Sequence, residues 1–147
     1  MKYFKELYDR GKSNSGRGDL YSEVALNHFK NPRNVGVIED ADAYARVGDP
    51  SCGDFLEIYL KLKLLKQDPP KSIITDVKFR VFGCPGAIVT SSIATELIKG
   101  NDVAFALSLS DDDVIEALGG LPEGKEHCSL MSVHAIRTAL SDIVKKD

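Results

Sequence analysis

Two stretches of the chain alternate between apolar and polar residues, which is the pattern of a β-strand that buries one face. They span residues 57–64 and 76–81, and a weaker strand is predicted for residues 43–47. The apolar positions are Ile58, Leu60, Leu62 and Leu64 in the first stretch and Val77, Phe79 and Val81 in the second. Because the loop 67–71 returns the chain, the pattern predicts an antiparallel meander of three strands, with one face that needs a cover.

A short helix is predicted before these strands and a longer one directly after them. The first begins at Ser22, which can cap it, and ends at Asn31-Pro32. Its expected apolar side consists of Val24, Ala25, His28 and Phe29. We therefore expect His28 to be packed or hydrogen-bonded rather than to bind a ligand. The second helix, residues 85–99, is small and apolar nearly all round, so we expect it to be buried against the sheet.

Three more helices are expected: residues 103–107, residues 111–118, and a last helix that starts near Cys128. The apolar stripe of the last helix is Val133, Ile136, Leu140, Ile143 and Val144. The fold class is therefore α+β: a three-stranded antiparallel meander covered by helices, with a long C-terminal helix. Residues 1–19 end in a stretch of linker composition and are predicted to be a flexible N-terminal extension of a domain that spans residues 20–147.

Composition narrows the classes of function. A chain of 147 residues fits one domain, and its net charge of −3 argues against nucleic acid as the main partner. No apolar run approaches the roughly 20 residues of a membrane span, so we expect no membrane partner and a cytoplasmic protein. The three cysteines cannot all pair with one another within the chain. In a reducing compartment such an odd set more often indicates metal binding or chemistry than crosslinks.

Each cysteine is predicted to lie at the end of an element. Cys52 shares a polar turn with Asp54 ahead of a strand, and Cys128 follows His127 at a helix start. Cys84 comes between a strand and a helix that opens with proline, so it is the expected N-cap, where the helix dipole favours the thiolate. Two plainer interpretations stay open: a buried free cysteine can be a small apolar residue, and an aspartate such as Asp54 can be a turn former.

The meander predicts which of these residues can meet. The turn before one strand and the end of its antiparallel neighbour lie at the same edge of the sheet, so Cys52 and Cys84 can lie close together. His127 and Cys128 would have to be brought there by the final helix, and the sequence pattern does not decide this. His134, also on that helix, is expected to face solvent or the sheet edge.

These residues and their flanks resemble the IscU/NifU-type iron–sulfur cluster assembly scaffolds, which share the IscU/SufE-like fold. The resemblance covers about residues 21–144 and rests on three flanked cysteines in the right order. The matching segments are Asn31-Pro32-Arg33-Asn34, Pro50-Ser51-Cys52-Gly53-Asp54, Phe82-Gly83-Cys84 and Lys125-Glu126-His127-Cys128-Ser129.

The resemblance implies a non-enzymatic scaffold that assembles a 2Fe-2S cluster from iron and sulfur and passes it to apo iron–sulfur acceptor proteins. A cysteine desulfurase of the IscS or NifS type would supply the sulfur. The implied cluster ligands are Cys52, Cys84 and Cys128, with Asp54 or His127 as the fourth. Cys128 is the favoured sulfur acceptor, and Cys52 is the alternative.

Two further inferences concern Lys125 and its loop. In an anionic site this lysine could offset charge or lower the pKa of Cys128, although a solvated surface lysine is as common. IscU proteins that use a dedicated DnaK-type chaperone carry a Leu-Pro-Pro-Val-Lys pattern in this loop. Here the loop is Leu121-Pro122-Glu123-Gly124-Lys125, which argues against recognition by such a chaperone.

The alternative function is that of a zinc-dependent sulfur-transfer protein resembling the SufU branch, in which zinc holds the cysteines until a desulfurase attacks. That branch has an insertion before the last cysteine and lacks the histidine that precedes it. This chain has a short connection and His127, which favours the scaffold. Zinc binding remains open in either case, because tetrahedral thiolate sites accept zinc readily.

Overall fold

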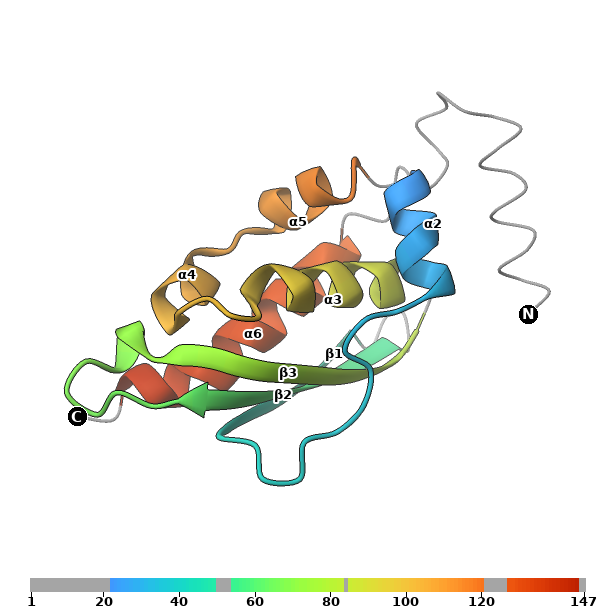
Figure 1. Cartoon of the computed structure of the whole chain (residues 1–147). Coiled ribbons are helices and arrows are strands. Elements are labelled where there is room, and N and C mark those ends of the chain that lie inside the picture. Colours follow the sequence, from blue (N-terminus) through green and yellow to red (C-terminus); the bar gives the residue numbers. More distant parts are fainter. Residues whose placement is uncertain (1–21, 50–53, 84, 121–126, 146–147) are drawn as a thin grey trace.

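The computed structural model describes residues 22–49, 54–83, 85–120 and 127–145. A three-stranded antiparallel sheet runs through it in the order β1-β2-β3 (Figure 1). The strands are β1 (Ala43–Asp49), β2 (Asp54–Lys63) and β3 (Ile73–Phe82). A single 3-10 turn, η1 (Pro69–Lys71), lies in the hairpin between β2 and β3. The meander predicted from the alternating pattern is confirmed.

Alternation along β2 separates a buried face from an open one. The buried members are Leu56, Ile58, Leu60 and Leu62. The prediction that Leu64 continues this face is wrong, since Leu64 is 47% exposed. The pairing of β2 with β3 shifts between Lys61 and Leu62 and ends at Lys63, so Leu64 lies beyond the last strand pair and in the hairpin.

The helices of the described residues lie on one side of the sheet, and none covers the opposite face (Figure 1). Contacts with the strands come mainly from α3, against β3, and α6, against β1 and β2. The helices are α2 (Glu23–Lys30), α3 (Pro85–Ile98), α4 (Val103–Ser108), α5 (Asp111–Ala117) and α6 (His127–Lys145). Their order and approximate bounds agree with the predicted pattern.

The hydrophobic core lies between the sheet and the layer formed by α3 and α6. Small residues along α3 allow a close approach to its neighbours, and Ala87, Ser91, Ser92, Ala94 and Thr95 are all buried. On α6 the predicted stripe is confirmed: Val133, Ile136 and Leu140 are buried, and Ile143 and Val144 pack against the core. His134 is exposed, as expected.

Helix α2 stands at one end of this layer. Ser22 caps it by accepting a hydrogen bond from the backbone N–H of Ala25 at 3.0 Å, which confirms the predicted start. The prediction that Val24 belongs to the buried side is wrong, because Val24 is 44% exposed. The side of this eight-residue helix that faces the core includes Leu26, which is buried and lies about 200° around the helix from Val24.

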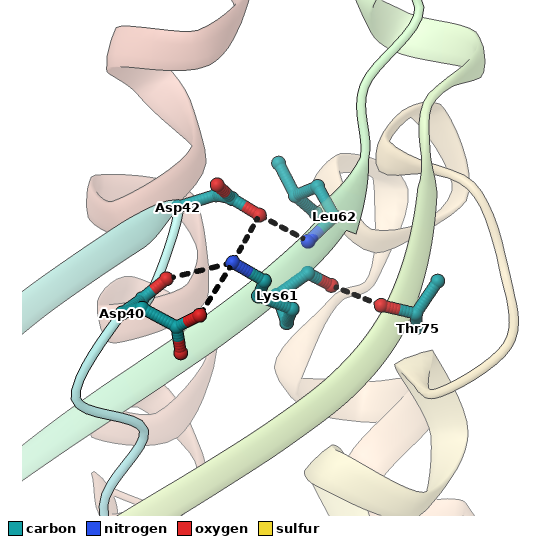
Figure 2. A network of polar contacts seen from close by, with 5 residues as sticks. All are labelled: Asp40, Asp42, Lys61, Leu62 and Thr75. Atoms are coloured by element: carbon teal, nitrogen blue, oxygen red, sulfur yellow. Dashed lines mark hydrogen bonds and ion pairs between the residues drawn. The ribbon is translucent and has the colours of Figure 1, made fainter.

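The connection from α2 to β1 is fastened to the sheet at two places. At the β3 edge, the carbonyl of Asn34 accepts from Phe79 N–H, and Gly36 N–H donates back to the Phe79 carbonyl, both at 2.9 Å. Asn34 adopts a left-handed conformation with φ of 62°, which asparagine tolerates better than most residues. Figure 2 shows the second place, where Lys61 Nζ contacts the carbonyl of Asp40 at 2.9 Å and the carboxylates of Asp40 and Asp42.

Candidate functional site

The predicted site residues fall largely outside the described part of the structure. Cys52, Cys84 and Lys125 lie outside the described residues, and so does the predicted N-terminal extension, residues 1–19. Asp54 opens β2, and His127 and Cys128 open α6, so their backbone is placed but their side chains are outside the description. The backbone that flanks these residues can therefore be located, whereas the contacts of their side chains stay predictions.

Two of the cysteine-bearing connections leave from the same end of the sheet. Asp49 pairs with Asp54 in the β1–β2 ladder, and Cys52 lies between them in the sequence. Phe55 pairs with Phe82, which is the last residue of β3 and lies two residues before Cys84. The described backbone on either side of both cysteines therefore meets at one end of the meander.

Helix α6 runs along the sheet and begins at this same end. It contacts η1, in the hairpin at the opposite end, and its last residues lie beside that hairpin in Figure 1. A helix of 19 residues spans about 28 Å, and a strand of ten residues spans about 33 Å. Since the two lengths are similar, α6 starts at the sheet end where β3 finishes and α3 begins. Tertiary packing supplies this placement of the α6 start, which the sequence pattern left undecided.

The open face of the sheet next to this end is aromatic and basic. The rings of Phe55 and Phe82 stack with their centroids 4.8 Å apart. The guanidinium carbon of Arg46 lies 4.4 Å from the centroid of Phe55, close enough for a cation–π interaction. Phe82 is 64% exposed and lies two residues before Cys84 in the chain. This end therefore presents exposed aromatic surface beside positive charge.

Two residues beyond Phe55 on β2, the buried carboxylate of Glu57 organises the open face. Glu57 accepts hydrogen bonds from Tyr44 Oη at 2.6 Å and from Arg80 Nη2 at 2.6 Å and Nε at 3.1 Å. The hydrogen bonds from Tyr44 and Arg80 hold the pKa of Glu57 below its ordinary value. The same contact with Glu57 raises the pKa of Tyr44. Sequence reasoning missed this network, and the only available signal was opposite charge on polar positions of two strands expected to pair.

His28 is engaged in structure, as predicted. It is buried, and its Nδ1 lies 2.7 Å from Ser92 Oγ on α3. Ser92 Oγ also accepts from the backbone N–H of Arg33 at 2.9 Å. Burial lowers the pKa of His28, and the positive charge of Arg33 lowers it further, while Glu96 acts in the opposite direction. This ring joins α2 to α3.

The donor set of the candidate site suits a soft or borderline metal. Cysteine thiolates favour iron–sulfur clusters and zinc, imidazole is intermediate, and carboxylate is a harder ligand. Within residues 22–49, 54–83, 85–120 and 127–145, the structure contains no group of three or more His, Cys, Asp or Glu that could hold a metal ion. Nor is any described helix long and apolar enough to cross a membrane.

The sheet and helices define a class of protein, a small α+β domain in which the strand and helix ends that flank the cysteines in the sequence lie at one end of a meander. A family model described as "NifU-like N terminal domain" matches residues 20–147. The chain belongs to this family.

Solved structures share the fold. A nitrogen-fixing NifU-like protein (N-terminal) from Brucella abortus superposes with a TM-score of 0.65 at 22% identity, covering 88% of this chain and 97% of that one. A putative iron–sulfur cluster assembly scaffold protein for the SUF system from Fervidobacterium islandicum gives a TM-score of 0.60 at 23% identity, covering 82% and 96%. At this level of identity the likeness concerns the fold.

Sequence relatives are much closer. The iron–sulfur cluster assembly scaffold protein IscU 1 of Archaeoglobus fulgidus is 48% identical over 87% of this chain and 79% of its own length. The IscU scaffold protein of Aquifex aeolicus is 43% identical over 86% of this chain and 77% of its own length. The nitrogen fixation protein NifU of Azotobacter chroococcum is 43% identical over 83% of this chain, but only 38% of that longer protein is matched.

Proposed function

We propose that this chain is a scaffold on which a 2Fe-2S cluster is assembled and from which it is passed to apo iron–sulfur proteins. The observation that carries the proposal is the common end of the sheet, where β1 finishes, β2 and α3 begin, and α6 starts. Each of the three cysteines follows or precedes one of these termini by a few residues in the sequence. Relatives at 43–48% identity are named as scaffolds of this kind.

We propose Cys52, Cys84 and Cys128 as the cluster ligands, with Asp54 or His127 as the fourth. Three thiolates bind iron strongly, while an oxygen or nitrogen donor leaves one corner that exchanges more easily. A site that has to release its cargo benefits from such a corner. The iron and sulfur are substrates that are delivered and removed. Sulfur that arrives as a persulfide needs two electrons from an external reductant to become cluster sulfide, and the residues of this chain hold the atoms in place.

Sulfur would arrive as a persulfide on a cysteine desulfurase. The thiolate of Cys128 attacks the outer sulfur of that persulfide, the donor's S–S bond breaks, and the donor cysteine leaves as a thiolate. A cysteine at the start of a helix favours the thiolate form that this attack requires. Lys125 would lower the pKa of Cys128 further, and Cys52 is the alternative acceptor. We place this exchange in the cytoplasm, where thiols stay reduced.

Anaerobic reconstitution with ferrous iron and sulfide tests the proposal. We expect visible absorbance of a 2Fe-2S cluster and about equal iron and acid-labile sulfide in the wild-type chain, and loss of both in Cys84→Ser. Ser108→Ala, an exposed change on α4, is the matched control and should behave as wild type. Unchanged iron and sulfide in Cys84→Ser would contradict the ligand assignment. Purified protein that binds stoichiometric zinc but never sulfide would favour the sulfur-transfer alternative.

The same assay separates the two candidates for the fourth ligand. If the Asp54 carboxylate forms the exchangeable corner, Asp54→Ala should lengthen the lifetime of the bound cluster, measured as the decay of its absorbance. Faster decay in this variant would count against that role for Asp54. His127→Ala, measured in parallel, shows whether the imidazole is needed to hold the cluster at all.

A further inference from the structure

We propose that Ser22 is a positioning residue, whose hydroxyl fixes the point at which the chain leaves α5 on its way to Cys128. This inference rests on the proposed role of Cys128 in the function above. It begins from one hydrogen bond, in which Ser22 Oγ donates to the backbone carbonyl of Leu118 across a sequence separation of 96 residues.

The carbonyl of Leu118 is the kind of group that needs an outside partner. Leu118 is fully buried and is the C-cap of α5. The last carbonyls of a helix find no N–H donor within the helix. The chain then reverses through Gly119 and Gly120, which both have positive φ, 77° and 103°. A side chain at Gly119 would begin 3.6 Å from Ser22 Cβ, so the two segments are in contact at this point. Backbone hydrogen bonds from Gly119 N–H to Glu116 and from Gly120 N–H to Ile115 close this turn, and Ser22 ties the turn to the start of α2.

The other side of α2 is fixed to α3. His28 and the backbone N–H of Arg33 both bond Ser92 Oγ, and Asn34 Nδ2 donates to Thr95 Oγ1 at 3.0 Å. Helix α3 is the element that follows Cys84, and the exit from α5 leads to Cys128. Figure 1 shows α2 standing between the end of α5 and the start of α3. Helix α2 is therefore hydrogen-bonded to the end of α5 through Ser22 and to α3 through His28, and we call this pair of connections the brace.

Ser22 has two separable tasks within this brace. Its Oγ accepts from Ala25 N–H, which caps α2, and its O–H donates to Leu118. Aspartate is as good an N-cap as serine but cannot donate when ionised, so Ser22→Asp keeps the cap and loses the brace. Threonine keeps both groups, so Ser22→Thr is the conservative control.

The test measures how fast iodoacetamide alkylates each cysteine in metal-free protein, resolved by mass spectrometry. In Ser22→Asp we expect the rate at Cys128 to rise about threefold to tenfold relative to Cys52, the factor that one hydrogen bond of ordinary strength contributes. Ser22→Thr should restore the wild-type ratio. Ser22→Gly, which costs a helix cap only slightly, gives a second route to the same loss of the donor.

Three results would overturn the proposal. One is an unchanged rate ratio in Ser22→Asp and Ser22→Gly. Another is an equal rise at all three cysteines, which would indicate general loss of stability rather than positioning. The third is a Ser22→Thr variant that behaves like Ser22→Asp. The experiment uses no iron or sulfide, so its outcome is independent of the reconstitution assay that tests the proposed function.

Discussion

The two faces of the sheet are stabilised in different ways, although the same three strands form both. On the covered face, Leu56, Ile58 and Leu60 are buried beneath α3 and α6. On the open face, the carboxylate of Glu57 is buried and accepts hydrogen bonds from Tyr44 and Arg80. The stabilisation from burying apolar area does not depend on the orientation of the groups or on protonation. The polar contacts of Glu57, in contrast, need a fixed geometry and an ionised carboxylate. The comparison predicts that the two faces respond differently to mutation and to pH.

The largest effect is expected on the covered face, from Leu60→Ala. The side chain is fully buried at the centre of β2, so its truncation removes apolar contacts and leaves a cavity. We expect a loss of about 2–5 kcal/mol in the free energy of unfolding, measured by urea denaturation. The loss should be the same at pH 7 and pH 5. A loss below 1 kcal/mol would show that neighbouring helices collapse onto the vacated space.

An intermediate effect is expected on the open face, from Glu57→Gln. The change removes the charge that Arg80 binds, and we expect a loss of about 1–2 kcal/mol near neutral pH, because Arg80 is half exposed and solvent weakens the pair. The lowered pKa of Glu57 means that its contribution is present above the ordinary value of 4.5 and is lost as pH falls through the folded pKa.

The difference between wild type and Glu57→Gln should therefore shrink as the solution is acidified, which paired urea titrations at several pH values would measure. Lys63→Gln is the matched control, since Lys63 is exposed and has no ion pair among the described residues. It should change stability little at any pH. A Glu57→Gln deficit that stays constant below pH 4 would mean that the carboxylate charge is not what stabilises the open face.

The smallest effect sharpens the comparison on the covered side, where polar groups also occur. Ser91 and Ser92 are adjacent and buried on α3, but Ser92 Oγ bonds His28 and Arg33, while Ser91 Oγ has no partner among the residues that the structure describes. Ser92→Ala should cost about 1 kcal/mol, and Ser91→Ala should be neutral or slightly stabilising, because it removes an unsatisfied buried hydroxyl. Thermal unfolding of both variants gives the comparison, and equal losses would contradict it.

The elements and their buried faces could be predicted from the sequence because both depend on local pattern. Ser22 indicates a helix start because it can cap one, Pro85 because proline suits the first helical position, and the alternation in β2 identifies its buried face. The predictions that Leu64 and Val24 are buried were wrong. A sequence pattern does not show where a strand pair ends or which side of a short helix faces the core. The contact between Ser22 and Leu118 joins residues far apart in sequence, which no local signal reveals.

The candidate site was predictable to a different extent. Residue type and flanking sequence were enough to identify the family. The predicted meander is confirmed by the strand ends that flank Cys52 and Cys84 in the sequence, which pair at one end of the sheet. The position of the α6 start depended on how the helix packs along the sheet, which only the fold supplies. How the thiols, Asp54 and His127 are arranged around a bound cluster stays a prediction.

The segment around Asn34 and Gly36 has a consequence for how molecules of this protein behave toward one another. A strand at the margin of a sheet can pair with a strand of a second chain, which is the first step of ordered aggregation. Here the chain's own backbone already occupies both hydrogen-bonding groups of Phe79 at that margin. The fold thereby blocks strand addition at the middle of β3 and leaves the neighbouring aromatic surface free for partners that do not bind by extending the sheet.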